Sequence, residues 1–465
     1  MKGAGVLLGR IRFILALLAG KLTRAALRAL GRNASYLPGA VALRLCPDFL
    51  SRADKPDRII AVTGTNGKTT VCNLIIDLLA QAGVRTLNNA LGSNTAAGIA
   101  SALLAGSGIT GRSKFQTAVF ESDERSARRL FPFIKPDHLV ITNLFRDSIM
   151  RNAHPEYIAG IIESALPGTT KLILNCDDLI SSSLAPSNPR AYFGIERMAG
   201  DVTQCVNRIN DIRLCPACDG ELVYDYRRYH HIGRARCPEC GFRSPEPDYE
   251  GADVDFDSMT MTVRDAGGEG GHALLSDSVF NVYNQLTAIA VMRELGYTHS
   301  RIREGFDAGV GILESRYSEE RAGDVTVVMQ MAKDRNALAC SRAFDYVGSR
   351  PGDKELILMM NNLHDSKNWS ENVCWLYDCD FEFLDRDDIT RIVATGPRAR
   401  DYYYRLLFAG VPEERLRCSD SELRAPELLE LRRGSSVYIL YGTDAIELAE
   451  RVRAETKRLA EVTAP

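Results

Sequence analysis

Four cysteines near the middle of the chain have the spacing of a metal site. They form two C-x-x-C pairs, Cys215 with Cys218 and Cys237 with Cys240, and 18 residues separate the pairs. The pattern predicts one zinc ion held by four thiolates, because the proline-containing knuckles suit the tight turns around a tetrahedral ion. Such a closed site leaves no position for a substrate, so the zinc is expected to be structural. We expect its loss to unfold the surrounding insert before it affects nucleotide binding. Coincidental cysteines or a redox pair are the alternatives.

A second group, TGTNGKTT at 63–70, has the composition of a phosphate-binding loop. Its two glycines let backbone N–H groups approach phosphates, Lys68 can reach the β- and γ-phosphates, and Thr69 can ligate magnesium. Val62 stands where the usual pattern has an earlier glycine, so this is a shortened variant. The sequence therefore predicts that ATP and Mg²⁺ bind here. The expected contacts are Gly64, Thr65, Asn66, Gly67, Lys68, Thr69 and Thr70.

The elements that must position this loop alternate between strand and helix. A strand is expected at 58–62, and a helix follows the loop and ends at Gly83, which suits a left-handed cap. The stretches QTAVFESDE, DHLVITN and KLILNCDD read as further strands that end in polar residues. Ligands of such α/β sheets bind at the carboxyl ends of the strands, so Glu121 is expected beside the loop as a magnesium ligand. An ordinary solvated strand end is the alternative.

Composition limits the classes of function. The 465 residues fit two or three domains, with 45% apolar and 25% charged residues. A net charge of −3 argues against nucleic-acid binding along the whole chain, although arginines and tyrosines between the cysteine pairs leave a local contact open. The other eight cysteines have no disulfide-framework spacing, which favours the reducing cytoplasm.

The first 54 residues form a basic and apolar segment. An apolar run, 13–19, lies between basic residues, and no acidic residue precedes Asp48. The run is shorter than the roughly 20 residues that span a bilayer. It predicts an amphipathic helix on the inner, anionic face of a membrane or, equally, an ordinary core helix, and a signal peptide is a further alternative.

Several motifs together resemble one family. TGTNGKTT, FESDE, ITNLFRD, LILNCDD and FNVYNQLTAIAV occur in the order and spacing of the central domain of Mur ligases. The resemblance implies an α/β fold with a Mur-ligase-type P-loop domain at 55–312, a four-cysteine zinc-ribbon insert at about 205–250, and a smaller α/β C-terminal domain at 313–465. It also implies that ATP activates a carboxylate as an acyl phosphate, which an amine then attacks.

The same resemblance assigns individual residues. Glu121 would bind magnesium, Asn284, the second asparagine of the N-x-x-N motif, would lie by the adenine, and Asn281 would also belong to the nucleotide site. One position departs from the pattern, because Asp147 is followed by Ser148 where many Mur ligases have histidine. The histidine ligand of a second metal is therefore missing or replaced.

The ribbon sequence narrows the resemblance to MurT-type subunits of lipid II isoglutaminyl synthase. That branch implies amidation of the D-glutamate α-carboxylate of lipid II to D-isoglutamine, with ammonia from a GatD-type glutaminase subunit. None of the cysteines lies in a G-x-C-x-G nucleophile turn, so the chain has no evident ammonia source of its own. An amino-acid-adding ligase of the Mur or folylpolyglutamate type and a non-catalytic nucleotide-binding protein are the alternatives.

The C-terminal motifs diverge from that branch. Its members typically read D-G-x-D-x-S-W, and Asn372 stands where the second aspartate helps the partner's Cys-His pair. An amide can orient a histidine but cannot carry the stabilising charge, so coupling to glutamine hydrolysis is in doubt. The K-N-P-x-G and T-Y-T-A motifs are also altered, at 333–337 and 442–445. The chain is therefore expected to be a diverged member.

Overall fold

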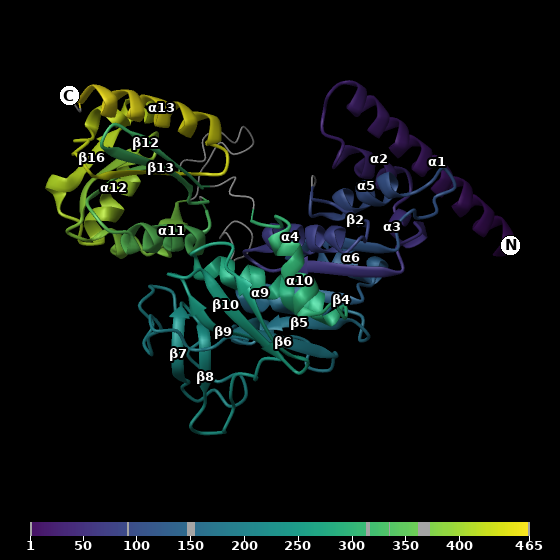
Figure 1. Cartoon of the computed structure of the whole chain (residues 1–465). Coiled ribbons are helices and arrows are strands. Elements are labelled where there is room, and N and C mark those ends of the chain that lie inside the picture. The colour runs from purple at the N-terminus through teal and green to yellow at the C-terminus, as the bar shows by residue number, and fades with distance from the viewer. Residues whose placement is uncertain are drawn as a thin grey trace. The chain divides into compact units, whose positions relative to one another are not determined.

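The computed structural model describes residues 2–90, 93–146, 154–312, 317–333, 335–360 and 373–463. The chain divides into two compact units (Figure 1). The first unit comprises Met1–Phe145, His154–Cys205 and Asp211–Ile312. The second unit comprises Arg146–Ala153, Val206–Asn210 and Leu313–Pro465.

A nine-stranded sheet forms the centre of the first unit, in the order β11-β10-β9-β6-β5-β4-β1-β3-β2. The strands from β9 to β2 are parallel, and β10 and β11 add an antiparallel edge. The predicted α/β class is confirmed. The strands are β1 (Arg58–Thr63), β2 (Thr86–Asn88), β3 (Thr117–Glu121), β4 (His138–Ile141), β5 (Lys171–Asn175), β6 (Arg190–Ile195), β9 (Tyr249–Asp255), β10 (Thr260–Asp265) and β11 (Gly268–Ala273).

The central strands are short and almost entirely apolar, because helices cover both faces of the parallel sheet. One hydrophobic core joins alternate residues of β1, β3, β4 and β5 to the helices of one face. Those helices include α5 (Ala96–Gly106), α6 (Ala127–Ile134), α7 (Pro155–Glu163) and α8 (Leu179–Ser182), and the N-terminal helices described below join the same core. Strands β1 and β3 also contact α4 (Lys68–Gln81), which packs on α9 (Val279–Glu294) and α10 (His299–Asp307). The chain leaves β1 toward β2 and β3 on one side and continues with β4 on the other, so β1 is the point where strand order reverses.

The N-terminal segment is helical: α1 (Lys2–Ala29), α2 (Leu37–Leu45) and α3 (Phe49–Arg52). Helix α1 packs on α2 and α5, with Ala16 and Leu17 buried. The ring of Phe13 stacks on that of Phe49 with centroids 5.2 Å apart. One face of α1 is thus a core face. Among the described residues, no helix is long and apolar enough to cross a membrane.

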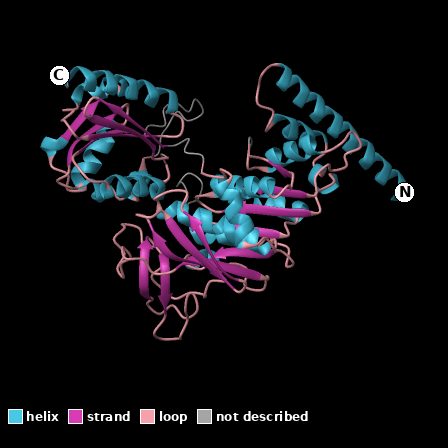
Figure 2. Cartoon of the chain, in the orientation of Figure 1, coloured by secondary structure: helices cyan, strands magenta, loops and turns pink. Residues whose placement is uncertain are grey.

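The cysteine insert contains a separate hairpin, β7 (Val223–Tyr229) and β8 (Ile232–Arg236), which Figure 2 shows as a pair of strands beside the large sheet. Its side chains form a small core with Leu179 of α8, which lies outside the insert. The other members of this core are Cys215, Leu222, Tyr224, Ala235 and Cys237. The insert therefore shares its core with the carboxyl-terminal side of β5.

The second unit is a smaller α/β layer structure with the sheet order β12-β13-β17-β14-β15-β16. Separate cores lie on its two faces, one containing residues of α11 and α12 and the other residues of α13. The strands are β12 (Tyr317–Ala322), β13 (Val325–Met331), β14 (Lys354–Met359), β15 (Ile389–Thr395), β16 (Leu416–Ser419) and β17 (Ser436–Tyr441). The helices are α11 (Ala337–Ser349), α12 (Ala399–Phe408) and α13 (Ile446–Thr463).

A short piece of the insert belongs to this second unit. Residues 206–210 bind Asp380, which is 1% exposed. The Asn207 amide donates to Asp380 Oδ2 at 2.7 Å, and the backbone N–H of Arg208 donates to Oδ1 at 2.6 Å. The Arg208 guanidinium also pairs with Glu382 at 2.8 Å. The second unit is therefore built from stretches far apart in the sequence.

Candidate nucleotide and zinc sites

The predicted phosphate loop connects β1 to α4 at the carboxyl edge of the sheet. Gly64 and Gly67 have φ values of 130° and 86°, a region that favours glycine. A Cβ added at Gly67 would collide with the side-chain oxygen of Asn284, and one at Gly64 would collide with the Thr142 hydroxyl. The two glycines are therefore required by both backbone conformation and close packing.

The residues after β4 hold the phosphate loop in place through hydrogen bonds. The Thr65 N–H donates to the Asn143 carbonyl at 2.8 Å, and the Asn66 N–H donates to Asn143 Oδ1 at 3.1 Å. The Thr142 hydroxyl donates to the Asn66 carbonyl at 2.6 Å. Sequence reasoning used this T-N pair only as part of a family motif and missed its role as a support for the loop. The polar residues directly after an apolar strand were the available signal.

Lys68 begins α4 and is held by an ion pair that the sequence did not predict. Its Nζ lies 2.8 Å from Glu124 Oε1, and it also donates to the Gly64 carbonyl. Burial alone would lower the pKa of the Lys68 ammonium, but the Glu124 carboxylate raises it and the net shift is upward. Lys68 is therefore a charged group at the mouth of the loop.

Thr69 and Glu121 are brought together as a candidate magnesium site. The Thr69 hydroxyl donates to Glu121 Oε2 at 2.8 Å, and the Asn94 amide donates to Oε1 at 3.2 Å. Asn89 fixes the backbone of Glu121 through two hydrogen bonds of 2.9 Å. Hydroxyl and carboxylate oxygens are the donors that Mg²⁺ prefers, so these residues fit the ion.

The N-x-x-N pair also lies at this loop. Asn284 Nδ2 donates to Asn281 Oδ1 at 3.1 Å, and Asn281 donates to the Ser276 hydroxyl at 3.2 Å. Both asparagines are on the first turns of α9, and Asn284 faces Gly67. Two other predicted positions, Ser148 and Asn372, lie outside the described residues.

The four cysteines of the insert converge on one point. Their sulfur atoms all lie within 4.8 Å of one another, with Cys215 to Cys240 at 3.6 Å and Cys218 to Cys237 at 3.5 Å. Four sulfurs around one zinc at about 2.3 Å would be separated by about 3.8 Å, so the cluster fits zinc.

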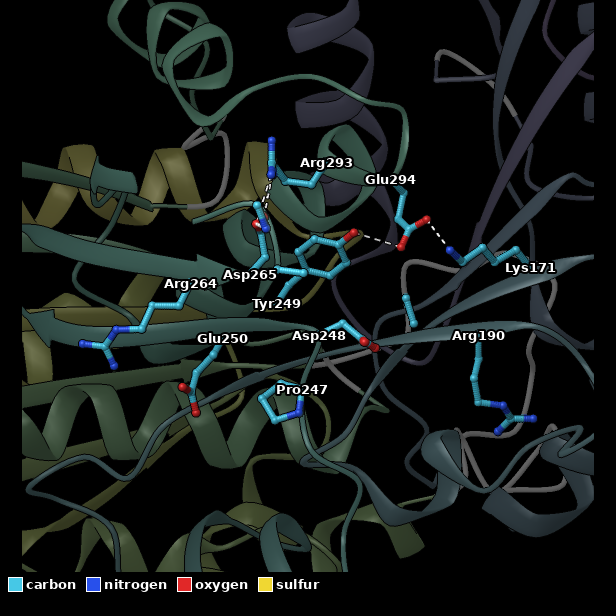
Figure 3. A pocket seen from close by; sticks show the side chains of 13 residues that line it. Lys171, Arg190, Pro247, Asp248, Tyr249, Glu250, Arg264, Asp265, Arg293 and Glu294 are labelled. Carbon is cyan, nitrogen blue, oxygen red and sulfur yellow. Dashed lines mark hydrogen bonds and ion pairs between the residues drawn. The ribbon is translucent and has the colours of Figure 1, made fainter. Parts of the chain in front are cut away.

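A polar pocket of about 510 Å³ lies at the opposite edge of the same sheet (Figure 3). Lys171 and Tyr249, the first residues of β5 and β9, both bind Glu294, at 2.6 and 2.9 Å. Arg293 pairs with Asp265 at 2.5 Å. These charged groups neutralise one another, and no predicted site residue lines the pocket. The pocket therefore carries no part of the nucleotide site.

The geometry is that of an α/β protein of the P-loop class, with four clustered cysteines that could hold a metal ion. Residues 62–199 match the family model of the Mur ligase middle domain, and residues 334–445 match that of the MurT ligase C-terminal domain. The chain is 32% identical over 399 residues to the lipid II isoglutaminyl synthase (glutamine-hydrolyzing) subunit MurT of Staphylococcus aureus strain COL, covering 84% of this chain and 86% of that protein. It is 30% identical to the MurT subunit of Streptococcus pneumoniae strain ATCC BAA-255 / R6, covering 92% and 94%. The chain therefore belongs to the MurT family of Mur ligases, as the sequence motifs predicted.

Solved structures show the same fold at lower identity. A pseudomurein peptide ligase type C from Methanothermus fervidus superposes with a TM-score of 0.65 at 19% identity, covering 89% of this chain and 81% of that one. MurF from Acinetobacter baumannii superposes with a TM-score of 0.61 at 15% identity, covering 90% and 80%. The Mur ligase fold, with a middle and a C-terminal domain, is thus confirmed.

Proposed function

We propose that this chain is the ATP-dependent ligase subunit of a lipid II isoglutaminyl synthase, and that it amidates the D-glutamate α-carboxylate of lipid II. The observation that carries the proposal is the near full-length similarity to two MurT subunits of that enzyme, combined with an intact phosphate loop. Ammonia would come from a glutaminase subunit of the GatD type. ATP use places the reaction in the cytoplasm.

The reaction would proceed in two steps. A carboxylate oxygen of lipid II attacks the γ-phosphorus of ATP, ADP leaves, and an acyl phosphate forms. Ammonia then attacks the acyl carbon, the bond to phosphate breaks, and the nitrogen loses a proton to give the amide. Lys68 would balance the charge of the transferred phosphoryl group. Thr69 and Glu121 would hold the magnesium ion, which supplies further charge neutralisation at the phosphates.

The nitrogen source tests this proposal. We expect ammonium to support ATP-dependent amidation of lipid II. We expect glutamine, supplied through a GatD-type glutaminase, to support it weakly because Asn372 replaces a carboxylate. Loss of such a carboxylate costs up to about 10⁴ in rate when the wrong histidine tautomer results. Asn372→Asp should then raise the glutamine-dependent rate and leave the ammonium rate unchanged, measured as amidated lipid II formed.

Two neighbouring aspartates serve as references for this experiment. Asp380 is buried beneath Asn207 and Arg208, so it is not available to a partner. The Asp378 side chain is 27% exposed, and Asp378→Asn is the informative control. If Asp378→Asn abolishes the glutamine-dependent rate, Asp378 and not position 372 serves the partner. ATP turnover that requires an amino acid in place of ammonium would contradict the amidation and favour an amino-acid-adding ligase.

Helix α1 supports a contact with the membrane that carries lipid II. Its outer face exposes one apolar stripe of regular helical spacing, whose members are between 40% and 71% exposed. They are Leu8, Ile11, Leu15, Leu18 and Leu22. Arg10, Arg12 and Arg28 are exposed on the same helix, and no acidic residue precedes Asp48. An apolar stripe with an excess of cations fits an anionic bilayer surface, and we propose this as the occupant.

Vesicle binding checks the membrane proposal. The intact chain should co-sediment with anionic vesicles at low salt, and the bound fraction should fall as salt rises or when neutral lipid is used. Replacing Leu15 and Leu22 by Ser should reduce binding severalfold, because each exposed side chain would otherwise enter the interface. Phe408→Ser, an equally exposed apolar residue on α12, is the matched control and should bind normally. Equal sedimentation of all three proteins would contradict the proposal.

A further inference from the structure

We propose that the zinc ribbon positions the nucleotide site, and that His231, in the turn of its hairpin, is the positioning residue. The ribbon would hold the segment after β4, and that segment holds the phosphate loop. This inference rests on ATP binding at the loop, which is part of the proposed function, but not on the identity of the acceptor. It assigns the ribbon a role beyond its own folding.

The ribbon is fastened to the end of β5 by buried charges. Asp177, which is fully buried, lies 3.3 Å from Arg234 and 3.6 Å from Arg228, both on the hairpin. The hydroxyl of Tyr283, on α9, donates to the same carboxylate at 2.7 Å. The backbone N–H of Gly233 donates to the Asp177 carbonyl at 2.8 Å. Buried charges are tolerated only with their partners in place, so the hairpin has one fixed position on the sheet.

From that position, His231 reaches the segment after β4 in two ways. Its ring is fully buried, and its Nε2 lies 3.1 Å from Asp178 Oδ1. The other oxygen of Asp178 accepts the backbone N–H of Leu144 at 2.7 Å. The His231 ring also packs on the Phe145 ring, with centroids 4.5 Å apart. Both residues that follow Asn143 are therefore held from the ribbon side.

Phe145 in turn is bound to the phosphate loop. Its N–H donates to Thr65 Oγ1 at 2.8 Å, and that hydroxyl donates to the Phe145 carbonyl at 3.2 Å. Thr65 is therefore hydrogen-bonded directly to Phe145, the residue whose ring His231 contacts. If the turn of the ribbon moved, Phe145 would move with it and would displace Thr65.

The four-cysteine cluster is connected to the phosphate loop through the same contacts, because it packs against the residue next to Asp178. Leu179 directly follows Asp178 and packs in the ribbon core with Cys215 and Cys237. Disorder at the cysteines would therefore loosen the residue that holds Leu144. From the sequence we expected zinc loss to unfold the insert before it affects nucleotide binding. The contacts instead lead us to expect that both change together.

Direct ATP binding by the full-length, zinc-loaded protein tests the inference. His231→Leu removes the contact with Asp178 and should weaken Mg-ATP binding about tenfold, measured by calorimetry. The KM for ATP should rise by a similar factor while kcat at saturating ATP changes little, because Lys68, Thr69 and Glu121 remain. His231→Gln retains a donor toward Asp178 and should recover part of the affinity. Zinc content and thermal unfolding are measured for each variant.

Arg236→Gln is the matched control within the hairpin. Arg236 makes an exposed ion pair with Asp225 at 3.2 Å, so its loss should leave ATP affinity unchanged. Should His231→Leu fail to fold, Phe145→Leu tests the next step and should weaken ATP binding in the same way. The double variant with His231→Gln should be less than additive. A folded, zinc-loaded variant with wild-type ATP affinity overturns the inference, whereas a wild-type chain that binds no ATP overturns the proposed function.

Discussion

Lys68→Ala is expected to reduce ATP turnover at least 10³-fold while the protein stays folded, because it removes the cation that meets the phosphates. The variant should be measurably less stable, since Glu124 loses the ammonium that lies 2.8 Å from it. Breaking such a buried pair costs about 3 to 5 kcal/mol. ADP release and urea unfolding measure the two effects.

The pH dependence of this variant has a definite sign. Burial raises the pKa of Glu124 even with Lys68 beside it, so the folded state holds its proton more tightly than the unfolded state. Without Lys68, the pKa of Glu124 in the folded state should rise further. The unfolding free energy of Lys68→Ala, relative to wild type, should therefore recover as the pH falls toward the Glu124 pKa and decline above it.

The chain offers a matched control at the opposite edge of the sheet. Lys171 pairs with Glu294 at 2.6 Å, in the same unit but away from the phosphate loop. Lys171→Ala should lower stability and leave ATP turnover unchanged. Turnover retained in Lys68→Ala would mean that the 63–70 loop is not the catalytic nucleotide site, and turnover lost equally in Lys171→Ala would mean that lost stability accounts for the effect of Lys68→Ala.

The second large effect concerns the metal. Purified protein should contain one zinc per chain, and Cys237→Ser should lose it together with the order of the insert. The apparent binding energy of comparable structural sites is about 10 to 16 kcal/mol, which exceeds what a hairpin and a small core can supply. Metal analysis and limited proteolysis between 211 and 248 follow the two losses.

Cys418→Ser is the reference for this variant, because Cys418 is an exposed thiol outside the cluster. It should keep full zinc and resist the protease as wild type does. A zinc content near zero in wild type, after expression with zinc supplied, would contradict the metal assignment. Intact zinc in Cys237→Ser would contradict the four-cysteine ligand set.

The fold was largely predictable because its signals are local. The apolar strands, the glycine loop and the two C-x-x-C pairs each occupy a short stretch whose residue types determine what it forms. The side chains that pair with the site residues were not predictable in the same way. Glu124 follows a strand among other acids, and nothing in FESDE marks it as the residue that pairs with Lys68.

Long-range pairings explain what sequence reasoning missed. His231 binds Asp178 across 53 residues, whereas the arginines and tyrosines around it in the sequence suggested only a local nucleic-acid contact. Arg228, part of the same basic run, is buried against Asp201 at 2.7 Å. The position of the hairpin on the sheet determines which basic residues face a buried carboxylate. That position cannot be read from the sequence of the hairpin alone.

The attachment of 206–210 to the second unit bears on how this protein can be divided and recombined. A fragment that begins at residue 313 would lack Asn207 and Arg208, so the buried Asp380 carboxylate would lose two of its donors. Unsatisfied buried carboxylates are costly, and such a fragment should be poorly stable by itself. Exchange of C-terminal domains between relatives would meet the same obstacle, because the recipient chain must supply a compatible stretch just before the first cysteine of its two C-x-x-C pairs. The two regions are therefore expected to be inherited as one module.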